Sequence, residues 1–170
     1  LHQVSWVRKA GVAGSNNPAP PGSGNMASLE FVRKLVARGA NVNAQVTKRP
    51  NMGVTTLNSI GSTPFLLATR TADFELMRLL AEFGADPLAP NEDGSTPLMV
   101  AAMRGHAATI PLFLNYGAMT HLLDNHGRSA RDLASENGHQ ECVEVLDAHD
   151  LKHMNLARCI IRGDMECLET

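Results

Sequence analysis

The sequence is poor in aromatic residues, which make up 4% of its 170 residues. It also lacks an excess of charge of either sign, since 15 Lys and Arg stand against 17 Asp and Glu. Without a basic stripe, a nucleic acid is a poor choice of partner. No apolar stretch approaches the roughly 20 residues of a membrane-spanning helix. Hydrophobic residues make up 44% of the sequence, which is enough to form a core. Because aromatic residues are scarce, we expect this core to consist of aliphatic side chains between thin layers of helices.

Cysteine is scarce as well, and three copies (Cys142, Cys159 and Cys167) cannot all pair within one chain. Cys142 occupies an apolar position of a predicted helix, where we expect a buried thiol; a Cys159–Cys167 bridge is the alternative for the other two. This usage favours a reducing, cytoplasmic compartment. Both ends read as cut within a motif, so a secretory signal could lie upstream, and a periplasmic or secreted location is the alternative.

A tetrapeptide, Gly-Ser-Thr-Pro, occurs at 61–64 and again 33 residues later at 94–97. A weaker copy, Gly-Arg-Ser-Ala, follows at 127–130 after the same interval. Each of the first two copies is followed by a segment that contains alanine, then by an apolar run and then by a Gly-Ala pair. A fixed period of this length indicates a stacked repeat protein whose units contact only their neighbours.

Each period predicts two helices and a turn-rich connection. Thr63 and Thr96 suit N-caps, and the proline after each suits the first helical position. The second helix presents an apolar stripe, as at Leu76, Leu79 and Leu80, and a glycine then ends it. Pro111 falls inside the second helix of its repeat, so we expect that helix to start late or to bend.

These motifs resemble the ankyrin repeat, because Thr-Pro-Leu, Ala-Ala, Gly-His and Gly-Ala follow one another in the family's order, and the family pattern is met most fully from Gly61 to Ala118. The first half is also similar to bacterial ankyrin-repeat proteins that carry inserted loops. The resemblance implies an all-α solenoid of stacked helix-turn-helix units with short β-hairpin fingers. The sequence departs from the family pattern where Ala72-Asp73 replaces Gly-His and where Asp150 replaces a helix-ending glycine.

The period predicts a single repeat domain over residues 1–170, regular only in its middle. Its parts are a partial repeat (1–44) with an inserted loop (11–24), a long finger loop (45–60), three repeats (61–90, 91–123 and 124–150) and a C-terminal partial or capping helix pair (151–170).

No nucleophile elbow, phosphate-binding loop or His-Glu-x-x-His motif is present, so we expect no enzyme activity, no cofactor and no metal. Chemistry on the inserted loops, where Lys48 and Arg49 stand, is the alternative. His106 and His139 occupy the Gly-His turn, where a hydrogen bond across repeats is the expected role.

Four other histidines leave a metal alternative open. His121 and His126 flank Asp124 on one finger, where zinc would need further ligands. His149 and His153 lie four residues apart, on one face of a predicted helix. Polar side chains in solvent are the simpler expectation for both pairs.

The resemblance implies that protein partners bind the concave face, made by the finger tips and the inner face of the first helices. Neither the core nor the turns require these positions. They are Ile60, Ser62, Arg70, Thr71, Glu92, Asp93, Ser95, Met103, Arg104, Asn125, His126, Arg128, Glu136 and Asn137. A structural or regulatory spacer in a longer polypeptide, or a solvated face that binds nothing, are the alternatives. Exposed apolar surface on an uncapped end favours a weak homo-dimer through the terminal repeats.

Overall fold

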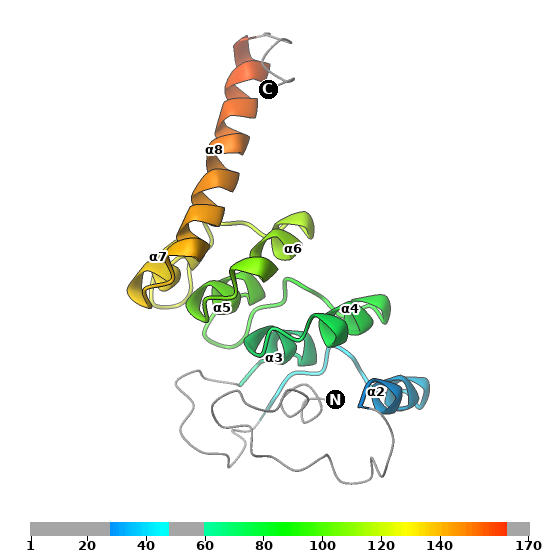
Figure 1. The fold of residues 1–170 in the computed structure, drawn as a ribbon. Coiled ribbons are helices and arrows are strands. Elements are labelled where there is room, and N and C mark those ends of the chain that lie inside the picture. Colours follow the sequence, from blue (N-terminus) through cyan, green and yellow to red (C-terminus); the bar gives the residue numbers. More distant parts are fainter. Residues whose placement is uncertain (1–27, 48–59, 163–170) are drawn as a thin grey trace.

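The computed structural model describes residues 28–47 and 60–162, and this part of the chain is helical without strands. Figure 1 shows helix pairs stacked side by side. The elements are α2 (Ser28–Ala37), α3 (Pro64–Arg70), α4 (Phe74–Glu82), α5 (Pro97–Met103), the 3₁₀ turn η1 (Ala107–Thr109), α6 (Ile110–Asn115), α7 (Ala130–Glu136) and α8 (Gln140–Arg162). The predicted all-α repeat fold is confirmed. The inserted loop 11–24 and most of the finger loop 45–60 lie outside the described residues.

The first helix of each regular repeat begins where the hydroxyl residues predict. The side-chain oxygens of Thr63, Thr96 and Ser129 accept hydrogen bonds from the backbone three residues on, at 3.2, 3.3 and 3.2 Å. Each bond satisfies an amide that the helix itself leaves without a partner. Pro64 and Pro97 occupy the first turn, where a missing N–H costs nothing.

Pro111 delays the second helix of its repeat, as predicted. Residues Ala107–Thr109 form a 3₁₀ turn, and α6 starts only at Ile110, so the proline lies in its first turn. There the proline ring removes no hydrogen bond of the helix interior.

The fingers are hydrogen-bonded turns rather than the short β-hairpins expected. In one finger the Asn91 amide donates to the Ser95 carbonyl at 3.1 Å, and in the next Asp124 donates to Arg128 at 2.9 Å. The base of the long finger loop is closed by a backbone bond of 2.8 Å from the Gly61 amide to the Val46 carbonyl.

The core is one layer of apolar side chains between an inner row of helices, α3, α5 and α7, and an outer row that includes α4 and α6 (Figure 1). Ala68, Ala101 and Ala134 are fully buried on the inner helices, where small side chains allow close packing. Phe65 of α3 and Phe113 of α6 meet edge to face, with ring centroids 6.3 Å apart, and so join two repeats.

Close contacts across repeats depend on a missing side chain at Gly105. Its φ is +73°, and a Cβ atom placed there would lie 2.6 Å from the ring of His139 in the next repeat. His106 reaches the other way, with Nε2 3.2 Å from the Arg70 carbonyl oxygen. The hydrogen bond predicted across repeats is therefore confirmed for His106, while His139 packs against a backbone.

Ala72 takes the place of a glycine and adopts its conformation. It has a φ of +48°, a left-handed backbone that is costly for a residue with a Cβ atom. The following Asp73 then caps α4 by accepting a hydrogen bond from the Leu76 amide at 3.2 Å.

The end of the stack differs from the helix pair expected over 151–170. Residues 140–162 form one continuous helix, α8, whose outer half projects beyond α6 and α7 (Figure 1). The physical reason is local: Gly84 and Gly117 end the earlier second helices with φ of +81° and +85°, but Asp150 stands at this position and continues the helix. Residues 163–170 lie outside the described part.

Three hydrogen bonds from two side chains fix the inner half of α8 to the stack. The guanidinium of Arg131 on α7 donates to both carboxylate oxygens of Asp147, at 2.6 and 3.1 Å. The Thr120 hydroxyl donates to Asp150 at 2.8 Å. Cys142, in the first turn of α8, is a buried free thiol, as predicted, and burial raises its pKa.

Candidate protein-binding surface

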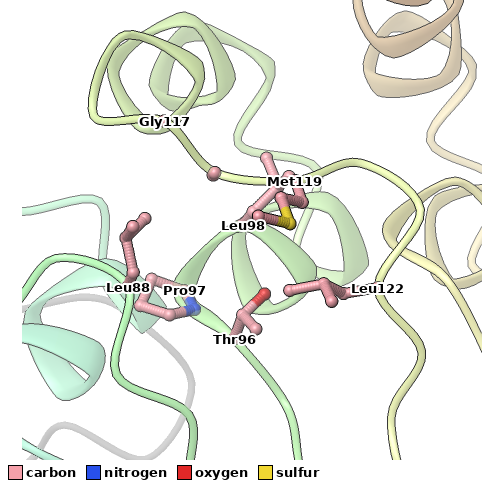
Figure 2. Close-up of a pocket in the computed structure, with 8 residues that line it drawn as sticks. Leu88, Thr96, Pro97, Leu98, Gly117, Met119 and Leu122 are labelled. Atoms are coloured by element: carbon pink, nitrogen blue, oxygen red, sulfur yellow. The ribbon is translucent and has the colours of Figure 1, made fainter.

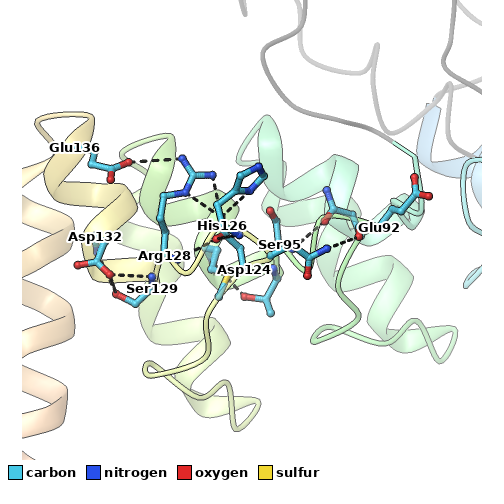
Figure 3. Close-up of polar contacts among 12 residues, drawn as sticks. Glu92, Ser95, Asp124, His126, Arg128, Ser129, Asp132 and Glu136 are labelled. Atoms are coloured by element: carbon cyan, nitrogen blue, oxygen red, sulfur yellow. Dashed lines mark hydrogen bonds and ion pairs between the residues drawn. The ribbon is translucent and has the colours of Figure 1, made fainter.

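The finger turn at 124–128 is built around a buried carboxylate (Figure 3). The side chain of Asp124 is 0% exposed. Its Oδ1 accepts hydrogen bonds from the amides of His126 and Arg128, both at 2.9 Å. Its Oδ2 accepts two more from the Arg128 guanidinium, from Nε at 3.1 Å and Nη2 at 2.8 Å. Four donors on one carboxylate hold this turn in a single conformation.

The electrostatics of Asp124 follow from these bonds. Burial by itself raises the pKa of the carboxyl, but the hydrogen bonds from Arg128 and from the His126 amide outweigh burial, so the net pKa is lowered. The hydrogen bond to Asp124 likewise raises the pKa of Arg128. A second contact, 3.6 Å from Arg128 Nη1 to Glu136 Oε2, carries the network to the end of α7.

The preceding finger uses the same design without charge. Asn91, one period before Asp124, accepts a hydrogen bond from the Ser95 amide at 2.8 Å. Asn91 and Ser95 are each 6% exposed. Asn-Ser in one finger and Asp-Arg in the next are therefore alternative ways to close the same turn.

Neighbouring fingers are joined by a backbone ladder. The Glu92 amide donates to the Ile60 carbonyl at 3.1 Å, and the Asn125 amide donates to the Asp93 carbonyl at 2.9 Å. The Asn125 side chain adds a bond of 3.0 Å to the Glu92 carbonyl. The finger tips thus form one continuous edge with their other side chains turned outward.

We call this edge, together with the last residues of α3, α5 and α7 and the residue after each helix, the finger–helix face. It contains all the residues predicted to bind a partner. The exposed ones are Glu92, Arg104, Asn125, His126, Glu136 and Asn137; the partly buried ones are Ile60, Thr71, Asp93, Met103 and Arg128.

Three predicted residues, Ser62, Arg70 and Ser95, are buried, at 1%, 6% and 6% exposure. Their side chains are covered, so the structure corrects their inclusion among direct contact residues. Arg128 is also less available than expected, because it holds Asp124. The sequence analysis missed Asp124 and Asn91 as organisers of the fingers. The signal was present in the paired change from Asn91 and Ser95 to Asp124 and Arg128, one period apart.

Among the described residues, the histidine pairs considered as metal sites do not gather enough ligands. Within residues 28–47 and 60–162, no three His, Cys, Asp or Glu side chains come together as a metal site needs. The rings of His149 and His153 lie against each other, with centroids 4.3 Å apart. In the same part of the chain, no helix is long and apolar enough to cross a bilayer.

An apolar cavity of about 100 Å³ lies beside the start of α5 (Figure 2). Its walls come from that helix and from the loops on either side. They are Leu88, Thr96, Pro97, Leu98, Gly117, Ala118, Met119 and Leu122. None of these side chains titrates, so the cavity offers no acid–base chemistry.

The stacked helix pairs and the finger edge define a helical-repeat scaffold. The chain belongs to the ankyrin-repeat family: residues 24–106 and 65–155 each match the family described as ankyrin repeats in three copies. Ankyrin repeats are a non-catalytic module that mediates protein–protein interactions.

Relatives come from animals and plants. The chain is 31% identical over 120 residues to ankyrin repeat domain-containing protein 63 of Mus musculus, covering 68% of this chain and 28% of that protein. It is 31% identical over 100 residues to a putative E3 ubiquitin-protein ligase, XBAT34, of Arabidopsis thaliana, covering 57% of this chain and 27% of that protein. The chain thus spans under a third of the length of these relatives. The expected likeness to bacterial proteins finds no support among them.

Proposed function

We propose that the finger–helix face, the concave side of the stack, binds a protein partner without catalysing a reaction. One observation carries this proposal: exposed side chains with no structural task lie together on rigid turns. Glu92, Arg104 and His126 are exposed, whereas their backbones are fixed by the fingers and by the end of α5. A preorganised surface loses little conformational entropy on binding.

The structure shows which residues of the finger–helix face can be changed to test partner binding without disturbing the fold. Met103 packs partly against the core, and Arg128 holds Asp124, so changing either would disturb the fold. Replacing Glu92, Arg104 and His126 together by alanine removes exposed side chains, with the loss of a long contact of 3.9 Å between His126 Nδ1 and Asp124 Oδ2. The matched control replaces Arg78, Glu144 and Lys152, which are exposed on α4 and α8.

The experiment is affinity capture of partners with both triple variants. We expect the Glu92, Arg104 and His126 variant to lose its partner while the control retains it, because contact residues concentrate affinity. Equal capture by the two variants, with unchanged thermal unfolding, would show that partners bind elsewhere.

A structural or regulatory spacer role is the second candidate. It is supported by the length of the relatives, in which the matched segment is only 28% or 27% of the protein. Replacing residues 60–150 of the native polypeptide by an unrelated ankyrin stack of the same length tests it. A spacer would keep its function after the exchange, whereas a binding face would lose it.

A further inference from the structure

The helix ends on the finger–helix face change charge along the stack. Arg70, Met103 and Glu136 are equivalent positions one period apart at the ends of α3, α5 and α7. The next position holds Thr71, Arg104 and Asn137. The face is therefore basic at the ends of α3 and α5 and acidic at the end of α7.

Arg70 and Arg104 form a pair of like charges. Arg70 is 6% exposed at the end of α3, which packs against α5. Burial, and then repulsion by the Arg104 charge, lower the pKa of Arg70 to about 10. Arg70 still carries its positive charge at neutral pH, so the fold holds a second positive charge close enough for Arg104 to repel it.

Arg104 itself is exposed just after the last residue of α5. Arg78, Arg128 and Arg131 each have a carboxylate within 4.0 Å. Within residues 28–47 and 60–162, no carboxylate forms such a pair with Arg104. The nearby Glu136 contacts Arg128 instead, at 3.6 Å.

Thr71 and Asn137, the equivalents of Arg104 in the adjacent repeats, are neutral and leave the positive charge of Arg104 uncompensated. The Thr71 hydroxyl donates to the Ala68 carbonyl at 3.1 Å, and the Asn137 amide donates to the Leu133 carbonyl at 2.7 Å. Both side chains are thus occupied with their own helix ends. Arg104 therefore offers its own guanidinium donors to an incoming anion at this place.

We propose that Arg104, backed by the Arg70 charge, binds an acidic segment of the partner protein. The inference rests on the proposed function of the finger–helix face and adds the chemistry of the partner. A carboxylate at Arg104 gains charge-assisted hydrogen bonds and relieves the repulsion between the two arginines. Glu92 and Asp93 at the finger tips disfavour the same acidic segment there, so its position across the face is defined.

The probes are two fluorescein-labelled Gly-Ser peptides, one with three consecutive glutamates and one with three lysines. Binding to the whole chain is measured by fluorescence anisotropy at low and physiological salt. We expect the glutamate peptide to bind more tightly, and Arg104→Gln to weaken it about fivefold, the scale of an exposed charge pair. Arg104→Glu should reverse the preference, and added salt should weaken binding by screening.

Arg78→Gln is the matched control, because Arg78 is an exposed arginine on the outer helix α4. An equal loss of glutamate-peptide binding in both variants, or none in Arg104→Gln, would overturn the inference. So would a lower melting temperature of Arg104→Gln that accounts for the loss, since Arg104 would then serve only the end of α5.

Capture of the native partner by the variants distinguishes a failure of this inference from a failure of the proposed function. Capture that is lost in the triple variant but unchanged in Arg104→Glu would overturn the acidic segment and leave the face intact. Capture unchanged in both would overturn the face, and with it the inference. Capture lost in Arg104→Glu and kept in Arg78→Gln supports both.

Discussion

The central unit (91–123) and the terminal unit (124–162) begin alike and end differently. Thr96 and Ser129 cap their inner helices in the same way, and both fingers close between their first and fifth residues. The central unit then ends at Gly117, with a repeat packed on each side. The terminal unit runs on through Asp150 into the exposed half of α8. The same motif therefore occurs in a unit packed on both sides and in a unit with one exposed end. How much a residue contributes to stability depends on whether its second side is buried, not on the motif.

The largest expected contrast is between buried and exposed leucines. Leu98 of the central unit and Leu146 of α8 are 1% exposed, whereas Leu151 of α8 is 55% exposed. We expect Leu98→Ala and Leu146→Ala to lower the free energy of unfolding by about 2–5 kcal/mol each. Leu151→Ala should change it by less than about 0.5 kcal/mol. Urea unfolding measures all three, and a cost at Leu151 like that at Leu146 would mean that the outer half of α8 is packed.

The two fingers allow an exchange of their polar pairs. Asn91→Asp places a carboxylate in a turn with no arginine, which should cost about 1–3 kcal/mol. Adding Ser95→Arg should recover much of that loss, because it recreates the pair of Asp124 and Arg128. Thermal unfolding of the single and double variants checks this, and a double variant no better than Asn91→Asp would show that the fingers are not interchangeable.

The charged finger should also respond to acid, unlike its neutral counterpart. The folded-state pKa of Asp124 is lowered, so its contribution is fully present above the ordinary carboxyl pKa of about 4. That contribution is lost as the pH falls through the lower folded-state value. Asp124→Asn should therefore lose less stability than the wild type between about pH 5 and pH 2. Parallel unfolding curves for the two proteins across this range would contradict the assignment.

Asp150 marks where the two units diverge, and changing it should make their ends alike. Asp150→Gly should end α8 near residue 150 at a cost of about 1 kcal/mol, and far-ultraviolet circular dichroism should lose the helical signal of residues 151–162. Asp150→Ala is the control, because it also loses the bond from Thr120 but favours helix. Equal helical signals in the two variants would show that glycine does not decide where this helix ends.

The smallest effect concerns association through the apolar loop that joins the central unit to the terminal unit. Met119, Leu122 and Leu123 are 57%, 42% and 59% exposed near α8, and we expect them to support a weak dimer. Changing Leu122 and Leu123 to glutamate should abolish it, whereas Phe74→Glu, at a residue 43% exposed on α4, should not. Sedimentation velocity at high concentration is the measurement. A monomeric wild-type protein at high concentration would contradict this prediction.

The sequence predicted what depends on local chemistry. Hydroxyl caps, the prolines after them, the late start at Pro111 and the His106 bond each follow from a residue and its immediate neighbours. The buried carboxylate of Asp124 did not emerge, because its partner Arg128 looked like a surface residue until the two fingers were compared. The break expected at residue 150 is wrong, because the match to the period outweighed the missing glycine. The cytoplasmic location stays a prediction.

At Gly105, both the backbone conformation and a side chain of the next repeat limit which residue can be substituted. His139 of the next repeat excludes any side chain there, whereas a Cβ atom on the equivalent Gly138 meets nothing within 4 Å. Both have φ near +74°, so asparagine, which accepts this backbone, would separate the two constraints. Gly138 should therefore accept asparagine, whereas asparagine at Gly105 would require the His139 ring to move. Thermal unfolding of the two variants would therefore show how much of the demand for glycine comes from contact between repeats and how much from the backbone alone.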